Sequence, residues 1–321
     1  MSLLATWLAS PPPDAAVEIA PERISAAVVS FRGNDPVVMS QVSEPLGAGV
    51  VVPSLTAVNI TDRPAVSGAL RRVLDRLPSK SRRVALVLPD SLARISLVRF
   101  DTVPQRRDDL DQLVRWQVRK STPFPIDDAV VTYTPGMAVG EAGREFLVAV
   151  ARQQVVAEYE SVCETAGAHA GLVDLSTLSL INMFLASKGV PTGDWLLVHV
   201  RSDSTSIAIV RDEHVIFYRN RAEDEEESLG DLVHQTAMYY QDRLSGQGFS
   251  KVMVGGLGRT SGSVDVARRS LEERLGVAVE AIDPTRMAAL TDRITTSPDV
   301  LDVLGPLVGV MLRTMRAGMA A

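Results

Sequence analysis

A repeated pattern of two strands joined by a short polar turn constrains the fold of this chain more than any other feature. Residues 17–29 align without gaps on residues 198–210, an offset of 181 (198 minus 17). Four aligned pairs are identical: Val17 and Val198, Ser25 and Ser206, Ala27 and Ala208, Val29 and Val210. Each copy reads as a hairpin followed by another β-rich piece, residues 36–39 or 214–218. Two such copies about half a chain apart predict a duplicated architecture of two lobes.

Periodic apolar segments occupy the residues between the two hairpins. The sequence predicts helices over 61–77, 108–120, 155–166 and 175–187, and strands over 84–88, 95–100, 129–133 and 146–151. We interpret residues 81–168 as an α+β subdomain inserted into the first lobe. That lobe then comprises residues 14–80 and 169–192, after a flexible N-terminal tail, residues 1–13.

Residues 193–321 form the predicted second lobe. After its hairpin, an acidic run at 223–227 precedes a helix over 229–244, and carboxylates there suit the positive end of the helix dipole. Further along the chain we expect a strand at 251–254, a glycine turn, a helix ending at 275, a strand at 277–282 and a helix at 300–315. The predicted fold class is therefore α/β.

Composition excludes several classes of protein. The net charge of −6 gives no global basic field, so we expect no nucleic-acid partner. Cys163 is the only cysteine and the four histidines lack paired ligand spacing, which argues against a metal site and for a reducing compartment.

No apolar run reaches the ~20 residues needed to cross a bilayer. Residues 1–10 carry apolar side chains at helical spacing, which fits either an unordered tail or a foot that touches a membrane or partner.

The stretch from Leu113 to Asp127, LVRWQVRKSTPFPID, resembles the Arg-Trp and Pro-Phe-Pro signature of the PilM family. The segment from Val210 to Arg219, which ends in Phe-Tyr-Arg, is similar to the hairpin of that family's second lobe. PilM proteins are cytoplasmic components of type IV pilus machines, in the actin-like ATPase superfamily, and are related to the cytoplasmic part of the type II secretion protein GspL. The resemblance covers roughly residues 14–316. It implies an actin-like (ribonuclease H-like) fold, and the absence of a transmembrane segment favours PilM over full-length GspL.

The resemblance also implies where ATP and Mg²⁺ would bind. The superfamily uses an Asp-x-Gly turn in each lobe, where the carboxylate organises Mg²⁺ and the glycine admits phosphate to the backbone. Here the turns read Glu18-Ile-Ala-Pro-Glu22 and His199-Val-Arg-Ser202, so both glycines are replaced and the second acid is missing. The remaining candidate nucleotide-binding residues are Glu18, Arg201, Ser202, Ser204, Thr205, Gly255, Gly256 and Gly258. The glycines are equally explained as a tight turn between strand and helix.

Two hypotheses of function follow. The first is a structural platform of a type IV pilus-like machine, with degenerate nucleotide loops and no catalytic residue. The second is an active actin-fold ATPase or small-molecule kinase. No aspartate lies in an Asp-x-Gly turn, which counts against the second hypothesis. Filament formation is a third alternative that the sequence leaves open.

A partner peptide is also implied by the resemblance. PilM-like proteins dock the cytoplasmic tail of the membrane protein PilN, an Asn-Leu-Leu-Pro type of peptide, and so are held at the inner membrane. We identify Trp116 as one candidate anchor, since tryptophan is favoured at interfaces, and the Pro123-Phe124-Pro125 segment as another. The Trp116 ring is equally explained as a core residue of the inserted subdomain, and burial is the favoured interpretation of Phe124. Pilus motor ATPases and further copies of the chain, in a homo-oligomer or ring, are additional candidate partners.

Overall fold

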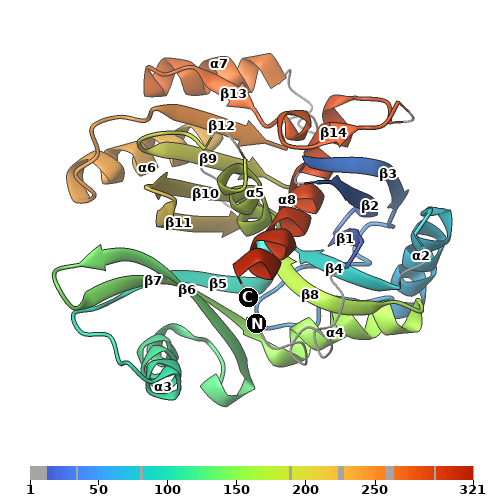
Figure 1. Cartoon of the computed structure of the whole chain (residues 1–321), viewed down its shortest axis with the longest axis horizontal. Helices are drawn as coiled ribbons and strands as arrows, with labels where there is room; N and C mark the ends of the chain where they lie inside the picture. The colour runs from blue at the N-terminus through green and yellow to red at the C-terminus, as the bar shows by residue number, and fades with distance from the viewer. Residues whose placement is uncertain are drawn as a thin grey trace.

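The computed structural model describes residues 13–33, 35–79, 82–187, 190–222, 228–256, 264–292 and 294–320. Nearly all of the predicted N-terminal tail, the acidic run 223–227 and Gly258 lie outside the described residues. The described chain folds into two lobes side by side, with a smaller sheet beneath the second lobe in the view of Figure 1.

The first lobe is built on a six-stranded sheet of order β14-β3-β2-β1-β4-β8. Its strands are β1 (Ala15–Ala20), β2 (Arg23–Arg32), β3 (Asp35–Pro45), β4 (Arg83–Leu88), β8 (His169–Leu175) and β14 (Ala289–Leu290). The first three strands pair antiparallel, and β1, β4 and β8 run parallel to one another. The strand β14 reaches this sheet from the second half of the chain and pairs with β3.

The second lobe repeats this order in a five-stranded sheet, β11-β10-β9-β12-β13. Its strands are β9 (Trp195–Val200), β10 (Ser204–Arg211), β11 (His214–Ala222), β12 (Lys251–Gly255) and β13 (Val279–Ala281). Antiparallel pairing joins β9, β10 and β11, and parallel pairing joins β9, β12 and β13. Two sheets with the same strand order and directions make the duplicated, actin-like architecture, so the predicted fold class is confirmed.

The duplication extends to individual residue pairs. Val17 lies opposite Ala26 in the first hairpin, and Val198, which is 181 positions later, lies opposite Ile207 in the second. The register between the second and third strands shifts at Val28/Val29 in one lobe and at Ile209/Val210 in the other, again 181 positions apart. The gap-free alignment predicted the strands, and the structure shows that the two copies also share their pairing register.

The inserted part contains a three-stranded antiparallel sheet of order β5-β7-β6. Its strands are β5 (Ala93–Phe100), β6 (Ala129–Val139) and β7 (Gly143–Arg152), and α3 (Arg107–Val118) covers one face. The predicted range 81–168 contains this sheet and also two elements that pack with the first lobe, β4 and α4 (Gln153–Thr165). Apolar periodicity shows that a segment is a strand or helix, but it does not show which sheet the segment joins.

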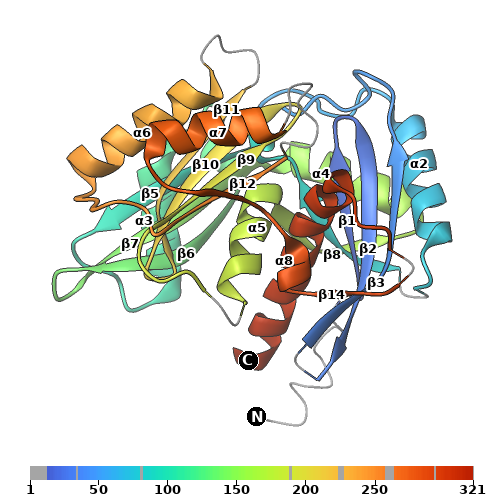
Figure 2. The ribbon, with the colours of Figure 1, turned by 90° about the horizontal axis from the view of Figure 1, so that it is seen from above.

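Six further helices complete the described fold: α2 (Arg63–Arg76), α4, α5 (Ser176–Leu185), α6 (Leu229–Arg243), α7 (Val264–Leu275) and α8 (Pro298–Ala320). Short 3₁₀ turns lie at Asp90–Leu92 (η1), Arg119–Ser121 (η2), Ile126–Asp128 (η3) and Pro284–Arg286 (η5). In Figure 2, α2 covers the outer side of the first lobe, α6 and α7 cover the second, and α5 and α8 lie between the two large sheets.

The helices α5 and α8 form a core that the two lobes share. Their apolar side chains cluster with strand residues from both large sheets, such as Ala16 and Val87 in the first lobe and Leu197 and Ala208 in the second. Two glycines allow the two helices to approach closely. A Cβ on Gly309 would lie 1.8 Å from the Ser179 carbonyl oxygen, and one on Gly305 would lie 2.7 Å from Leu180 Cδ2.

Cys163 is fully buried in the first-lobe core. Burial, together with Glu160 and Glu164, raises the pKa of its thiol to about 12.

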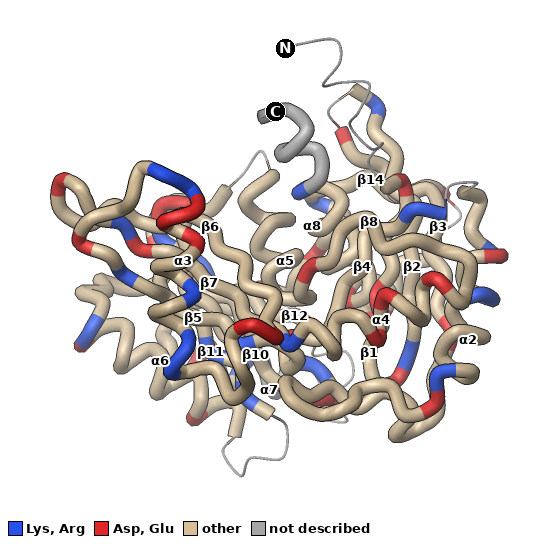
Figure 3. The backbone as a smooth tube through the Cα atoms, turned by 90° about the horizontal axis from the view of Figure 1, so that it is seen from below, with Lys and Arg blue, Asp and Glu red and all other residues tan. Residues whose placement is uncertain are grey.

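Acidic and basic residues are interspersed over the coloured part of the backbone in Figure 3. Among the described residues, no helix combines the length and the apolar character that a bilayer crossing needs.

Candidate functional site

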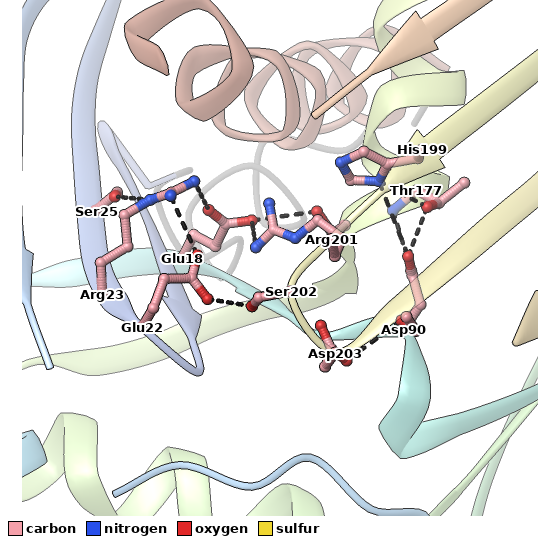
Figure 4. A network of polar contacts seen from close by, with 12 residues as sticks. Glu18, Glu22, Arg23, Ser25, Asp90, Thr177, His199, Arg201, Ser202 and Asp203 are labelled. Carbon is pink, nitrogen blue, oxygen red and sulfur yellow. Dashed lines mark hydrogen bonds and ion pairs between the residues drawn. The ribbon is translucent and has the colours of Figure 1, made fainter. Parts of the chain in front are cut away.

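Two equivalent hairpin turns meet where the two lobes contact each other, and we call this contact region the cleft (Figure 4). The first turn is Pro21-Glu22, closed by the pair Ala20 and Arg23. The second is Ser202-Asp203, closed by a hydrogen bond from the Arg201 amide to the Ser204 carbonyl, 2.8 Å. Both turns follow the carboxyl end of the first strand of their sheet, where ligands bind in open α/β sheets.

A buried ion pair joins the two turns. Glu18 is 1 % exposed and Arg201 is 8 % exposed, and Arg201 Nη2 lies 2.9 Å from Glu18 Oε1 (Figure 4). Burial alone would lower the pKa of Arg201, but the carboxylates around it, Glu18 first among them, outweigh burial and raise that pKa. The Arg201 charge is therefore held by a carboxylate of the opposite lobe.

Further contacts surround this pair. Ser202 Oγ donates a hydrogen bond to Glu22 Oε2 across the cleft. Arg23 Nη1 donates to Glu22 Oε1 at 3.1 Å, and its Nε donates to Ser25 Oγ at 3.1 Å. The Ser25 hydroxyl, in β2, therefore helps to orient Arg23.

A second buried cluster lies beside the first, around Asp90 of η1. Asp90 is 2 % exposed and accepts hydrogen bonds from the Thr177 amide (3.0 Å), Thr177 Oγ1 (2.5 Å) and Ser206 Oγ (3.0 Å). Burial raises the pKa of Asp90 to about 6. Its carboxylate thus caps the N-terminus of α5 while it contacts a strand of the second lobe.

His199 occupies the position that is 181 residues after Glu18. Burial, followed by the nearby Arg201 charge, lowers the pKa of His199 well below its usual value, so the ring is neutral. Its Nδ1 lies 2.9 Å from Thr177 Oγ1. Since that hydroxyl donates to Asp90, it accepts from His199, which assigns the proton to Nδ1.

The next two predicted residues, Ser204 and Thr205, begin β10 and are buried. Ser204 is 1 % exposed, and its hydroxyl accepts a hydrogen bond from Asn220 Nδ2 at 3.1 Å. Ser91 of η1 donates to Asp203 and lies 3.2 Å from Ser204 Oγ, so it provides another contact between the lobes. Thr205 is 9 % exposed and follows in β10.

The predicted glycine turn packs against the protein itself. A Cβ on Gly256, which has a φ of +83°, would lie 1.8 Å from the Val200 carbonyl oxygen. A Cβ on Gly255 would lie 2.7 Å from Ile282 Cδ1. The Gly256 amide donates to Asp302 Oδ1 of α8 at 2.9 Å. Close internal packing therefore accounts for both glycines.

The structure brings Glu18, Arg201, Ser202 and Ser204 together at this contact between the lobes and adds residues that the sequence analysis missed. Four carboxylates (Glu18, Glu22, Asp90 and Asp203) surround two guanidinium groups (Arg23 and Arg201). Asp90 lies two residues after Leu88, the last residue of the apolar strand β4, so a polar residue just beyond a strand's carboxyl end was the available signal in the sequence. No sequence pattern pointed to Asp302. It accepts a hydrogen bond from the Gly256 amide only because α8 crosses the molecule next to the glycine turn. In the described ranges, no group of three His, Cys, Asp or Glu side chains is placed to hold a metal ion.

An apolar groove with a volume of about 360 Å³ lies away from this cleft, between the small sheet and α5. One wall consists of alternate residues of β6 and β7, including Val130, Thr132, Leu147 and Ala149. The opposite wall consists of Leu178, Ile181 and Leu185 of α5 and of Val215 in the second lobe. At one end, Arg313 Nη1 lies 2.8 Å from Asp174 Oδ2 and supplies a polar boundary.

The candidate partner residues lie on α3 and in the segment after it, and they do not line this groove. The Trp116 side chain is 66 % exposed, whereas Phe124 packs partly buried against the core between α3 and the small sheet. Pro123 and Pro125 flank Phe124 and are exposed. Trp116 is therefore a surface residue, and Phe124 contributes to the core.

Comparisons with known proteins give a consistent result. The model of the family "Type IV pilus assembly protein PilM" matches residues 16–238. A solved PilM-PilN type IV pilus biogenesis complex superposes with a TM-score of 0.79 at 16% identity, covering 94% of this chain and 98% of that one. Two looser likenesses are the ethanolamine utilization protein EutJ from Carboxydothermus hydrogenoformans (TM-score 0.49, 12% identity, 95% and 90% covered) and the cytoplasmic domain of EpsL from Vibrio cholerae (TM-score 0.44, 12% identity, 81% and 93% covered).

No curated protein sequence matches the chain at a significant level. The family match nevertheless covers well over half of the residues, and the PilM structure shares the arrangement of lobes and sheets described above. The chain therefore belongs to the PilM family of type IV pilus assembly proteins.

Proposed function

We propose that this protein is a cytoplasmic scaffold of a type IV pilus-like machine, held at the inner membrane by the tail of a PilN-like protein that docks in the apolar groove. Family membership supports the assembly role, and the related structure is a complex with PilN. The groove is the observation that carries the proposal, because it is large enough for several side chains of an extended or helical peptide.

The chemistry of the groove fits the Asn-Leu-Leu-Pro type of tail expected from the resemblance. Its apolar walls suit leucine side chains. The polar end, at Asp174 and Asn182, offers a carboxylate and an amide for a side chain such as asparagine. A leucine pair would then lie between β6 and α5, and the asparagine would lie near Asp174.

A peptide titration tests the docking site. A fluorescein-labelled peptide containing Asn-Leu-Leu-Pro is titrated with the purified protein, and anisotropy is followed. We expect micromolar binding, about −8 kcal/mol, and a loss of about tenfold or more in affinity for Val130→Arg, which places a charge on the apolar wall. Val58→Arg is the matched control, because Val58 is an exposed valine on a loop outside the groove.

The same titration separates the two candidate surfaces. Binding that survives Val130→Arg but is lost in Trp116→Ala would move the docking site to the outer face of α3. Equal binding by all variants would contradict both surfaces.

We further propose that the cleft between the lobes is a degenerate nucleotide site. Its two arginines are engaged by Glu18 and Glu22, and the Gly256 amide is engaged by Asp302. A triphosphate would have to displace these contacts and would meet four carboxylates. Repulsion between like charges in a buried site opposes such binding.

Calorimetric titration with Mg-ATP tests this second proposal. We expect no binding heat up to millimolar ATP, since the cleft offers no unengaged cation among the residues described here. ATP turnover that disappears in Glu18→Ala would overturn the proposal.

The alternative function, an active actin-fold ATPase or kinase, draws on one observation. Asp90 lies in the cleft with a pKa near neutrality, which is a property of general bases. Its oxygens, however, already accept three hydrogen bonds within the protein. If Asp90 were a catalytic base, Asp90→Asn would abolish a measurable phosphoryl-transfer activity while the fold was retained.

A further inference from the structure

The helix α5 connects the cleft to the groove. Its first two residues lie in the cleft: Ser176 Oγ donates to Glu18 Oε1 at 3.1 Å, and Thr177 contacts both Asp90 and His199. Within the next three turns, Leu178, Ile181 and Leu185 line the groove. A helix of 10 residues is about 15 Å long and moves as a rigid element, so its N-terminus and its groove face are displaced together.

Side-chain bonds across the cleft determine where the second lobe lies relative to this helix. We call the contacts Glu18–Arg201, Glu22–Ser202 and Ser91–Asp203 the interlobe latch. Each contact joins a residue of the first half of the chain to the turn between β9 and β10. Figure 4 shows the first two contacts side by side, with Asp203 and Asp90 next to them.

The groove itself is formed by both lobes. In addition to the walls from the small sheet and α5, the β10–β11 turn contributes Glu213, His214 and Val215. Asp212 and Glu213 adopt positive φ values of 48° and 66° at this turn, which projects from the second lobe toward the groove. A change in the distance between the lobes would therefore alter the width of the groove directly, and a shift of α5 would alter it from the other side.

We propose that the interlobe latch sets the width of the apolar groove. The latch stabilises one relative position of the lobes and of α5, and that position shapes the groove. A partner that prefers this shape gains affinity from the latch, and by linkage it strengthens the latch in return. This inference rests on the proposed function in one respect: it takes the groove to be the site where the partner docks.

Amide hydrogen exchange of the whole chain tests the inference without a partner peptide. The double variant Glu18→Gln/Arg201→Met removes both charges of the buried pair, so neither is left unpaired in the core. We expect exchange to become about tenfold faster or more in α5 and in the β10–β11 turn, because local opening there no longer requires breaking the ion pair. Exchange in α2, on the outer side of the first lobe, should match wild type.

The control variant is Arg274→Met, which removes an ion pair with Asp231 between α7 and α6, outside the cleft. It should leave exchange in α5 and the turn unchanged. Wild-type exchange rates in the double variant would overturn the inference. A uniform increase over both lobes would also overturn it, since that result describes general destabilisation. Failure of the peptide titration alone would reject the docking site and leave this coupling intact.

Discussion

At the scale of single residues, Asp90 is a buried carboxyl group whose ionisation the fold perturbs strongly. Burial raises its pKa from 3.8 to about 6, while Thr177 and Ser206 donate hydrogen bonds to it. The titratable and charged groups near it include His199, which stays neutral, together with Asp203, Tyr218 and Arg201. The fold therefore favours the protonated carboxyl of Asp90 relative to the unfolded chain.

This shift predicts a pH dependence of stability. Because the folded pKa is the higher one, the favourable contribution of Asp90 is complete below about pH 4 and is lost as the pH rises through about 6. A rise from 3.8 to about 6 corresponds to about 3 kcal/mol. Urea unfolding of wild type and Asp90→Asn from pH 7 to pH 4 should show wild type gaining up to this amount relative to the variant. Parallel stability curves for the two proteins would contradict the assignment.

At the scale of elements, the crossing of α5 and α8 depends on glycine. Gly309 lies against the backbone of Ser179, and Gly305 lies against the side chain of Leu180. The helix α8 also contains Pro306, whose missing N–H leaves one hydrogen bond of the helix unmade. Gly305, Pro306 and Gly309 all lower the intrinsic helical propensity of α8. The two glycines in return allow α8 to pack closely against α5.

Gly309→Ala should therefore destabilise the protein even though alanine is the better helix former. A Cβ 1.8 Å from the Ser179 oxygen requires the two helices to separate, and overpacking of this kind costs about 2 kcal/mol. The matched control is Gly68→Ala in α2, where the nearest atom is 3.6 Å away on the flexible Arg72 side chain. That change should stabilise the protein by about 0.5–1 kcal/mol. Thermal unfolding of both variants measures the two signs, and equal shifts would contradict the account.

The elements also show how far the sequence alone could lead. The two hairpins followed from one alignment. Their equivalent pairing register and the register shifts 181 residues apart became visible only in the structure. The assignment of β4 to the first sheet did not follow, since a buried apolar strand has the same pattern in either sheet. In the candidate site, Glu18 and Arg201 were identified individually. Their pairing was not, because it requires two turns that are distant in sequence to meet.

At the scale of the whole molecule, the core that contains α5 and α8 joins the lobes into one unit. Trp195 of β9 is 1 % exposed, and its ring lies 5.6 Å from that of Phe184 in α5. The same cluster includes strand residues of the first-lobe sheet. Each large sheet has a core of its own on one face, but its other face packs in this shared cluster, so neither lobe can lose its packing without exposing apolar surface of the other.

We therefore expect a single unfolding transition. In a Trp7→Phe/Trp116→Phe variant, Trp195 is the only tryptophan and reports on the shared core. Its fluorescence and the far-UV circular dichroism of the whole chain should change at the same urea concentration. A plateau in which the fluorescence has changed while half of the dichroism remains would show that the lobes unfold separately.

The burial of Cys163 has a practical consequence at this scale. Its thiol has a pKa of about 12 and lies in the first-lobe core, so at neutral pH it is almost entirely protonated and shielded from reagents. Cysteines introduced at Thr132 and Glu213, on opposite sides of the groove, would be labelled selectively with the native cysteine left in place. The molecule can thus carry a pair of spin labels across its own groove, and the separation of the lobes becomes a distance that can be measured in solution.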